Sequence, residues 1–253
     1  MTKADDFFIK ENKVDYISDE MYANIDYIID CVDAAARITY QTVYVIDYYK
    51  QNFLYVSDNP LFLCGLTAEE VKELGYSFYI NHVVPEDLEL LLEINMAGFL
   101  FYKEFPKEER KEYTLSYDFC IKDKISGKKS LINHQITPMR LTENGQLWLA
   151  LCAVCLSSNT ESGNIVVTKR NSSKQWYFDR KNRKWKEMLR PALKSIEIEV
   201  LRLSAMGYTM NEIADEIHRS QDTVKMYRKN IFEKLNVDSI VTAISYAKNH
   251  RLI

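Results

Sequence analysis

Two helical segments joined by a very tight turn constrain the C-terminal part of this chain more than any other feature. The first, 209–220, opens on Thr209 and has Glu212 at its third helical position, which is a capping box. The second is SQDTVKMYRKNIFEKL, 220–235, with Ser220 as its candidate N-cap. Two short helices so closely spaced, the second of them cationic, are typical of a helix-turn-helix.

The two sides of the second helix differ in chemistry. On a wheel of about 100° per residue, Val224, Ile231 and Leu235 fall close to one direction, so this side is predicted to pack inward. The residues on the outer face are Lys225, Met226 and Lys229. No acid occurs from 223 to 232, whereas a merely solvated face would more often include acids for i,i+4 pairs. The pattern therefore predicts a polyanionic partner. In a nucleic acid, the residues on the outer face would contact base edges, and the residues on the two flanks of the helix would contact phosphates.

Charge is unevenly distributed along the 253 residues. The formal balance is -11 over 1–168 and +8 over 169–253, which together give the net charge of -3. An acidic N-terminal part joined to a basic C-terminal part indicates that the C-terminal part binds a polyanion.

The helix expected at 195–207 is predicted to end at Gly207 and to bury a set of apolar side chains. That set is Ile196, Val200, Leu201 and Leu203.

The C-terminal residues resemble the LuxR-type (GerE-like) DNA-binding domain of bacterial transcription regulators. The matching residues include Glu197, Glu199-Val200-Leu201, Gly207, Glu212-Ile213-Ala214, Ser220, Thr223-Val224-Lys225, Ile231, Lys234-Leu235 and Val237. The resemblance implies that double-stranded DNA is the partner and that Lys225, Met226 and Lys229 read bases. The phosphate contacts expected from it are Ser220, Thr223, Tyr227, Arg228 and Lys234. It also implies a dimerisation helix that starts near Asp238, and hence a homodimer.

The N-terminal part is predicted to combine strands and helices in a fixed order. Two strands are expected within 41–59, followed by helical pieces that include 85–102 with Pro85 at its start. Three more strands are predicted at 113–123, 129–141 and 146–156. This order, together with NHVVPEDLELL at 81–91, resembles the PAS domain. The resemblance implies a sensory domain that responds to a small molecule or to a protein.

No cofactor or metal is expected in this sensory domain. Cys152 and Cys155 form the only CxxC of the five cysteines, and in a strand they point to opposite faces and pack in the core. No reactive-cysteine flavin motif is present, and His82 and His134 are interpreted as hydrogen-bonded structural residues rather than haem ligands. The 17 Tyr and 11 Phe would either fill the core or line a ligand cavity.

The N-terminal segment offers a second candidate for dimerisation. Residues 19–38 are predicted to form one amphipathic helix whose apolar seam packs on its own domain or on a second copy. The seam consists of Met21, Ile25, Ile28, Val32 and Ala35. The region 158–190 contains strand-like pieces with Trp176, Tyr177 and Trp185 as expected anchors, and these pieces would extend the sensor or set the angle of a linker.

The fold class predicted is therefore α+β, with an N-terminal PAS-like antiparallel sheet with helices and a C-terminal all-α four-helix helix-turn-helix domain. The predicted segments are a helical segment at 1–39, a PAS-like sensory domain at 40–157, a basic linker or β-hairpin extension at 158–190, and a LuxR-type domain at 191–253.

The function predicted is sequence-specific DNA binding by a transcription regulator. The alternative is an interaction module that docks on RNA polymerase or another protein through the helix-turn-helix. An enzyme is not expected, because the sequence contains no Ser/His/Asp set, P-loop or Gly-rich dinucleotide loop. The longest apolar run, 147–156, is far shorter than the ~20 residues that span a bilayer, and the acidic N-terminus lacks a signal-peptide core. A cytoplasmic protein without membrane contact is therefore expected.

Overall fold

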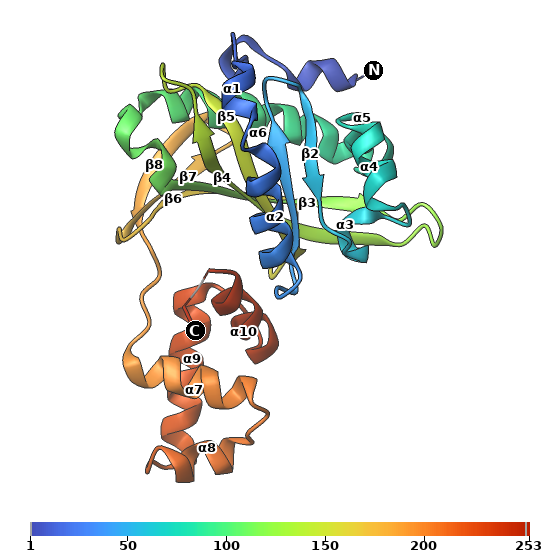
Figure 1. Ribbon diagram of the computed structural model, residues 1–253. Coiled ribbons are helices and arrows are strands. Elements are labelled where there is room, and N and C mark those ends of the chain that lie inside the picture. The colour runs from blue at the N-terminus through green and yellow to red at the C-terminus, as the bar shows by residue number, and fades with distance from the viewer. Residues whose placement is uncertain (1, 251) are drawn as a thin grey trace. The chain divides into compact units, whose positions relative to one another are not determined.

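The computed structural model describes residues 2–250 and 252–253, and the chain divides into two compact units (Figure 1). The N-terminal unit runs to Leu156 and takes in Glu161–Met188, and the C-terminal unit includes Leu189–Ile253. Each unit has a hydrophobic core of its own.

A single antiparallel sheet forms the centre of the N-terminal unit, and within the described residues it has eight strands in the order β2-β1-β5-β4-β3-β6-β7-β8. The strands are β1 Thr42–Asp47, β2 Asn52–Val56, β3 Tyr113–Lys122, β4 Lys129–Leu141, β5 Leu147–Leu156, β6 Gly163–Lys169, β7 Lys174–Asp179 and β8 Lys184–Leu189. The predicted order of two strands, a helical middle and three strands is confirmed, and so is the α+β fold class.

Helices lie on both faces of this sheet (Figure 1). The long helix α6, Pro85–Glu104, covers one face, with Pro85 at its start as predicted, while α2 lies against the other face. The remaining helices of the unit are η1 Ala4–Phe7, η2 Lys10–Asn12, α1 Asp19–Tyr22, α2 Ile25–Ala36, α3 Pro60–Leu63, α4 Ala68–Leu74, α5 Ser77–His82 and η3 Lys107–Glu112. None of the helices in the described part of the chain is long and apolar enough to cross a membrane.

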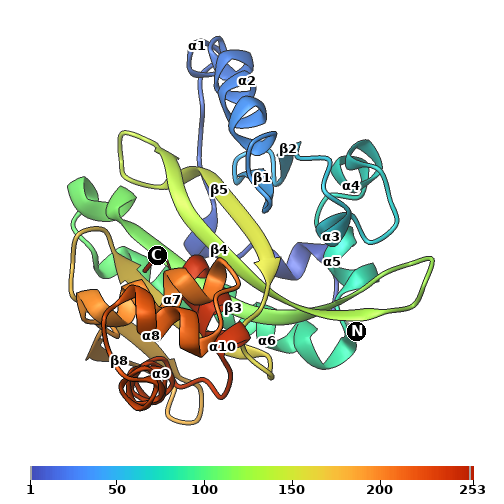
Figure 2. The same cartoon turned by 90° about the horizontal axis from the view of Figure 1, so that it is seen from below.

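The long strands β3 and β4 end together in a hairpin turn next to α3 (Figure 2). The turn is held there because the Lys124 N–H donates to the carbonyl oxygen of Cys64 at 2.8 Å. On the opposite side of β3, strands β6, β7 and β8 continue the sheet. Trp185 stacks on Phe101 of α6 with ring centroids 4.5 Å apart, whereas Tyr177, an expected anchor, is 41% exposed. Residues 163–189 thus extend the sheet of the N-terminal unit.

The single helix predicted over 19–38 is wrong, because α1 ends at Tyr22 and α2 begins at Ile25. Asn24, at the break, is a poor helix former. The Tyr22 side chain is also drawn toward the sheet, where its hydroxyl donates to Asp47 Oδ2 at 2.5 Å and its ring meets Trp148 edge-on. This tertiary anchoring interrupts the local helical pattern.

The apolar seam expected on that helix is only partly covered. Val32 is buried, but Met21 is 38% exposed and Ala35 is also exposed. A shallow groove runs between α2 and the sheet. The seam therefore contributes one buried side chain to the core rather than a continuous packed stripe.

One glycine sets how closely α6 can approach the sheet. A Cβ added at Gly98 would lie 3.0 Å from the Leu115 Cδ2 atom of β3. A side chain at this position would require the Leu115 side chain to shift by a few tenths of an ångström. Gly98 therefore permits a close approach of α6 to β3.

The C-terminal unit consists, in its described residues, of four helices. They are α7 Ser195–Ala205, α8 Met210–Glu216, α9 Gln221–Leu235 and α10 Ile240–Asn249. Thr209 and Glu212 form the predicted capping box at the start of α8, with the Thr209 N–H donating to Glu212 Oε2 at 2.7 Å. At the C-terminal end of α9, Asn236 adopts a left-handed conformation with φ of 54°, which ends the helix. The all-α four-helix prediction is confirmed.

Candidate nucleic-acid interface and internal cavity

The underside of α9 anchors this helix in the C-terminal unit. Val224 and Ile231 are fully buried and Leu235 is 3% exposed, as the helical wheel predicted. They join a core supplied mainly by α7, α8 and α10, which includes Val200, Leu201, Ile213, Ala243 and Ala247. Burying each such side chain stabilises the fold by roughly 1.5–3 kcal/mol. This packing holds the opposite face of α9 toward solvent.

The start of α9 is capped by its predicted residue. Ser220 Oγ accepts the Thr223 N–H at 3.3 Å, and the two side-chain oxygens lie 2.9 Å apart. Both hydroxyls are therefore at the positive end of the helix dipole. Such an end attracts anions, which suits the predicted phosphate contacts of Ser220 and Thr223. No observation of bound DNA tests these two roles, so they stay predictions.

The three predicted base-reading residues all face outward. Lys225 and Lys229 have 57% and 76% of their side chains exposed, and Met226 is 50% exposed. Acids flank this face nevertheless, since Lys225 Nζ lies 3.0 Å from Asp222 Oδ1 and Lys229 Nζ lies 3.8 Å from Glu233 Oε1. Exposed pairs of this kind are worth only about 0–1 kcal/mol. The lysines can thus exchange these carboxylates for phosphate or base acceptors at low cost.

Two further predicted contacts lie on the flanks of α9 and are half-buried. Tyr227 packs against the hydrophobic core of the unit and is half-buried. Arg228 holds its guanidinium over the ring of Phe232, 5.9 Å from the centroid. The stacked guanidinium is pre-positioned, and its N–H donors remain suited to phosphate oxygens.

A buried carboxylate, which sequence analysis missed, joins α7 to α9. Glu197 is 1% exposed, whereas Ile196, predicted to be buried, is only half-buried. Glu197 Oε2 accepts the Lys194 N–H at 2.7 Å and the Lys234 Nζ at 2.6 Å. The inward position goes to the carboxylate because it caps its own helix and pairs with a cation.

Lys234 therefore has an intramolecular partner at the position where a phosphate contact was predicted. Its side chain is 32% exposed and its ammonium group is paired with Glu197. The ion pair gives Lys234 a structural role, which is to hold α9 against α7. A phosphate contact by the same ammonium stays a prediction, and the two roles have separable effects on stability and on affinity.

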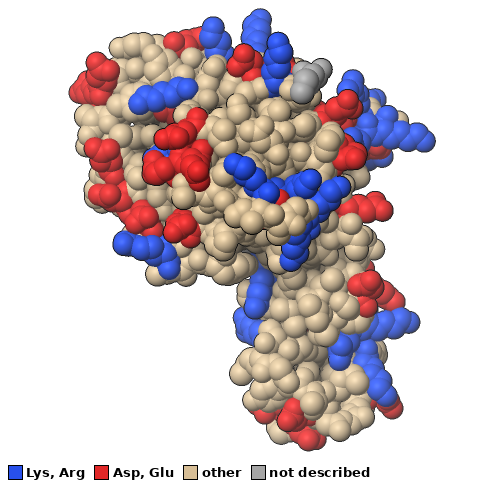
Figure 3. All heavy atoms as spheres, turned by 90° about the vertical axis from the view of Figure 1, so that its right-hand side faces the viewer, with Lys and Arg blue, Asp and Glu red and all other residues tan. Residues whose placement is uncertain are grey.

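The surface of the C-terminal unit carries both signs of charge. Figure 3 shows basic side chains along one side of this unit with acidic side chains near them. On the N-terminal unit, acidic side chains predominate over part of the face in view. Of the +8 balance of residues 169–253, +6 falls in 169–188, which belong to the N-terminal unit, and +2 in 189–253. Within the C-terminal unit, the outer face of α9 gathers cations with no acid between them in the sequence.

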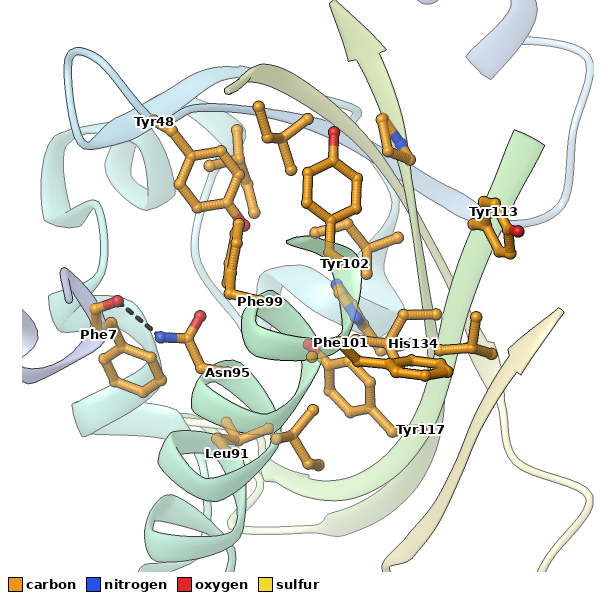
Figure 4. A pocket seen from close by; sticks show the side chains of 18 of the residues that line it. Phe7, Tyr48, Leu91, Asn95, Phe99, Phe101, Tyr102, Tyr113, Tyr117 and His134 are labelled. Atoms are coloured by element: carbon orange, nitrogen blue, oxygen red, sulfur yellow. Dashed lines mark hydrogen bonds between the residues drawn. The ribbon is translucent and has the colours of Figure 1, made fainter. Parts of the chain in front are cut away.

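A cavity of about 100 Å³ lies inside the N-terminal unit, between α6 and the sheet (Figure 4). Its walls are mainly aromatic, with Tyr48, Phe99 and Tyr102 on one side and Tyr117 and His134 on the strands. Phe7 and Asn95 close one end, where Asn95 Nδ2 donates to the Phe7 carbonyl oxygen at 2.8 Å. The many Tyr and Phe residues were predicted either to fill the core or to line a cavity, and some of them line this cavity.

His134 belongs to a buried chain of hydrogen bonds. Its Nε2 atom lies 2.5 Å from the hydroxyl of Tyr44, which in turn lies 2.6 Å from the hydroxyl of Tyr79. His134 is 1% exposed, and burial lowers its pKa to about 3. Burial also raises the pKa of Tyr44 and Tyr79 well above the ordinary value. All three groups are therefore uncharged at neutral pH.

Two polar atoms at this cavity are buried without a hydrogen-bond partner. They are His134 Nδ1 and the Tyr102 hydroxyl oxygen. The structural interpretation of His134 therefore accounts for only one of its ring nitrogens. His82 fits that interpretation better, since its Nδ1 lies 3.2 Å from the Lys122 carbonyl oxygen. Buried polar atoms are usually paired, so the two unpaired atoms call for an explanation.

The described residues contain no group of three or more His, Cys, Asp or Glu side chains that would hold a metal ion. Cys152 and Cys155 are buried in the core, and burial raises the pKa of both thiols. The raised pKa keeps them in the protonated, weakly nucleophilic form. Their environment is that of packed core residues.

The C-terminal unit defines a class of protein module. A capped helix follows a second helix after a tight turn, its apolar stripe is buried and its cationic face is exposed, which is the arrangement of a helix-turn-helix domain. Residues 192–247 match the family described as bacterial regulatory proteins, luxR family. The C-terminal domain is therefore a luxR-family helix-turn-helix domain, as its residues suggested.

Curated relatives are similar to this chain over only part of its length. The Fimbriae Z protein of Salmonella typhimurium is 43% identical over 61 residues, which are 24% of this chain and 29% of that protein. The response regulator protein VraR of Staphylococcus saprophyticus is 39% identical over 104 residues, 40% of this chain and 45% of that protein. The chain thus spans less than half the length of these relatives.

Solved structures that are similar over a larger share of the chain are distant in sequence. A VqmA dimer of Vibrio cholerae is 15% identical with a TM-score of 0.35, and the similarity covers 88% of this chain and 87% of VqmA. The PAS domain of Bordetella pertussis BvgS is 17% identical with a TM-score of 0.34, covering 55% of this chain and 88% of that domain. At such scores the superpositions are loose.

Proposed function

We propose that this protein is a sequence-specific DNA-binding transcription regulator whose activity is set by a signal at its N-terminal sensory unit. The observation that carries the proposal is the outward face of α9, where Lys225, Met226 and Lys229 stand exposed above a fully buried apolar stripe. A helix about 10–12 Å wide with such a face fits the major groove of B-DNA.

The remaining charges of α9 support the same proposal. Arg228 and the capped start of the helix at Ser220 lie on either side of the reading face, where phosphates border a major groove. Contacts of this kind set the position of the helix and make affinity depend on salt through counterion release. A homodimer would place two such helices about one turn of DNA apart, near 34–36 Å. A regulator that binds chromosomal DNA acts in the compartment where that DNA lies, so the proposal includes a cytoplasmic location.

The proposal is tested by measuring DNA affinity with the full chain. A binding site is first selected from a randomised duplex library, and fluorescence anisotropy then gives the affinity at several salt concentrations. The variants are Lys225→Ala and Lys229→Ala, separately and together. We expect each single change to lower specific affinity by ~1–3 kcal/mol, because each removes a base contact. Affinity should also fall steeply as salt rises.

A matched control removes two lysines from elsewhere. Lys124→Ala with Lys128→Ala deletes the same charge from the β3–β4 hairpin of the N-terminal unit, and it should leave the affinity unchanged. Equal affinity of the Lys225/Lys229 double variant and the native chain would show that α9 does not read DNA. Binding that is insensitive to salt would instead favour a protein partner for the helix-turn-helix.

A further inference from the structure

An acidic side chain, Asp222, stands at the N-terminal end of the outer face of α9, just before the acid-free stretch 223–232. It precedes Lys225, Met226 and Lys229 by 3, 4 and 7 positions, so at about 100° per residue all four side chains share one face of the helix. The Asp222 side chain is 89% exposed, more than either lysine. The face proposed to read bases therefore begins with a carboxylate.

The contacts of Asp222 show that it does not cap the helix. The cap is Ser220, whose Oγ accepts the Thr223 N–H at 3.3 Å. Asp222 Oδ1 accepts from Lys225 Nζ at 3.0 Å, and Oδ2 has no partner within the part of the chain that the structure describes. A lysine ammonium group has three donors. One oxygen of the acid and two donors of the lysine are therefore left for a partner outside the chain.

A carboxylate at this end of α9 would be unfavourable against DNA unless a base compensated for it. Duplex DNA carries one negative charge per about 1.7 Å of helix axis. In a helix-turn-helix, the N-terminal residues of the recognition helix meet the base edges, and Asp222 is the second residue of α9. The phosphates repel a carboxylate there, so its presence calls for a hydrogen-bond donor on a base.

The major groove offers two such donors. A carboxylate only accepts hydrogen bonds, and the donors at the base edges are the N4 amino group of cytosine and the N6 amino group of adenine. Adenine places the acceptor N7 beside its N6, and that acceptor repels a carboxylate. Cytosine is therefore the better match for Asp222. Its partner base, guanine, presents the acceptors O6 and N7, to which lysine donates.

We infer that Asp222 is a specificity-determining residue that reads one G·C base pair together with Lys225. Asp222 Oδ2 accepts from cytosine N4, and Lys225 Nζ donates to the guanine of the same pair while it stays bonded to Asp222 Oδ1. The inference rests on the proposed DNA-binding function and adds one element of the preferred sequence. A reversed pair would place the carboxylate at guanine acceptors, so the orientation of the pair is read as well.

Lys229 is expected to meet a different base pair. Seven positions separate it from Asp222, which is about 10 Å along the helix axis at 1.5 Å per residue. Stacked base pairs are about 3.4 Å apart, so the two side chains are about three base pairs apart. Substitutions of Asp222 and Lys225 should therefore act on one position of the binding site, and those of Lys229 on another.

Base preference is measured position by position with the full chain. The chain selects a site from a randomised duplex library, and fluorescence anisotropy then gives its affinity for every single base-pair substitution of that site. We expect one position where cytosine is preferred over each other base by about tenfold or more, within the range of a mismatched pair. Asp222→Ala should reduce this preference to about threefold or less and leave the other positions unchanged. Lys225→Ala should act on the same position.

Asp222→Asn gives a sharper test, because it should change the preference rather than remove it. The asparagine amide has an acceptor and a donor, which match adenine N6 and N7. The preferred base at this one position should therefore change from cytosine to adenine. Thymine, the partner of adenine, still offers its O4 as an acceptor for Lys225.

Glu233 provides a matched control on the same helix. It lies near the C-terminal end of α9, is 65% exposed, and has its Oε1 atom 3.8 Å from Lys229 Nζ. Glu233→Gln removes the same charge from the same side of the helix, but away from the end that meets base edges. It should change the affinity for all duplexes by one common factor and keep every base preference. Far-UV circular dichroism checks that each variant is folded.

The inference is overturned if Asp222→Ala raises the affinity for all duplexes by one factor and keeps every base preference, because Asp222 would then be only a charge at the start of the helix. It is also overturned if Asp222→Asn still prefers cytosine, or if Asp222 and Lys225 act on different positions. These outcomes leave the proposed DNA binding intact when Lys225→Ala and Lys229→Ala still lower specific affinity. A chain that selects no site would overturn both.

Discussion

The two units of this protein differ in where their candidate binding groups lie. The N-terminal unit has them inside, around a cavity, and the C-terminal unit has them outside, on an exposed helix face. The N-terminal unit has a core rich in aromatic side chains, and two of its buried polar atoms without a partner, Tyr102 Oη and His134 Nδ1, belong to residues that line an internal cavity. The C-terminal unit has a small aliphatic core, and its distinctive side chains stand outside on α9. A cavity suits a ligand that must be enclosed, whereas an exposed helix suits a partner far larger than the domain.

This difference also explains how each unit uses packing. In the N-terminal unit, large aromatic side chains around the sheet both fill the core and line the cavity beside α6. Short aliphatic residues such as Val224 and Ala243 are fully buried in the core of α7 to α10. The two cores thus differ in composition, aromatic in the N-terminal unit and aliphatic in the C-terminal unit.

The largest effects are expected from deleting one matched core side chain in each unit. Ile132→Ala in β4 and Ile231→Ala in α9 both truncate fully buried isoleucines and should each lower the free energy of unfolding of their own unit by about 2–5 kcal/mol. All three tryptophans lie at 148, 176 and 185, so tryptophan fluorescence follows the N-terminal unit alone. Far-UV circular dichroism follows the helices of both units.

Independent cores predict that Ile231→Ala leaves the fluorescence transition in place while helical signal is lost earlier. It should abolish DNA binding without affecting the cavity. A shift of both transitions together in either variant would show that the units unfold as one, and would remove the basis for comparing them separately.

A smaller effect is expected from the ion pair that joins α7 to α9. Glu197→Gln removes the charge of a buried carboxylate and leaves Lys234 without its counter-ion, so the C-terminal unit should lose about 1–3 kcal/mol of stability. The value is discounted because Lys234 is partly exposed. Chemical unfolding followed by circular dichroism measures the change.

The same pair sharpens the assignment of Lys234. A double-mutant cycle with Glu197→Gln and Lys234→Met gives the coupling energy of the pair. If Lys234 also contacts phosphate, Lys234→Met should weaken binding to all duplexes alike. It should also reduce the slope of log affinity against log salt concentration by about 1. Unchanged affinity at a concentration where the variant is folded would restrict Lys234 to its structural role.

The mildest effect is a loss of stability in acid, and it should appear in both units. Burial lowers the pKa of His134 to about 3 and that of His250 to about 4, against an ordinary value of 6.5. Because the unfolded chain takes up these protons first, stability is full above pH 6.5 and falls as the pH drops toward the folded pKa values. By pH 5.5 each histidine should cost its unit about 1.4 kcal/mol.

Single substitutions assign this acid sensitivity. His250→Phe keeps a ring for stacking on Tyr246, whose centroid lies 4.0 Å away, and should flatten the pH dependence of the helical transition only. His134→Phe should flatten that of the fluorescence transition only. Equal pH profiles in the variants and the native chain would point to carboxylates as the origin.

Local patterns predicted local features of both units. The starts of α8 and α9 follow from Thr209 and Ser220, because an N-cap and its partner lie three residues apart in sequence. Strand positions follow from runs of β-branched and aromatic residues, and the inward stripe of α9 follows from helical periodicity. None of these features depends on a residue distant in the chain.

The features that sequence analysis missed depend on distant partners. Tyr22 interrupts a helix because Asp47 and Trp148 bind it, and Glu197 is buried because Lys234, 37 residues away, neutralises it. The unpaired Nδ1 of His134 follows from what surrounds a residue of β4 in three dimensions, which a strand pattern does not contain. The abundance of Tyr and Phe was the one available signal of a cavity.

The separation of the two sides of α9 has a consequence for how such a protein changes over time. Residues that hold the helix in place and residues proposed to read DNA are different sets, since Val224 is fully buried while Met226 is half exposed. Replacing the outer set alters which target is preferred without loosening the domain. New regulatory circuits can therefore arise through a few surface substitutions, and the same freedom is open to engineers who wish to redirect the protein.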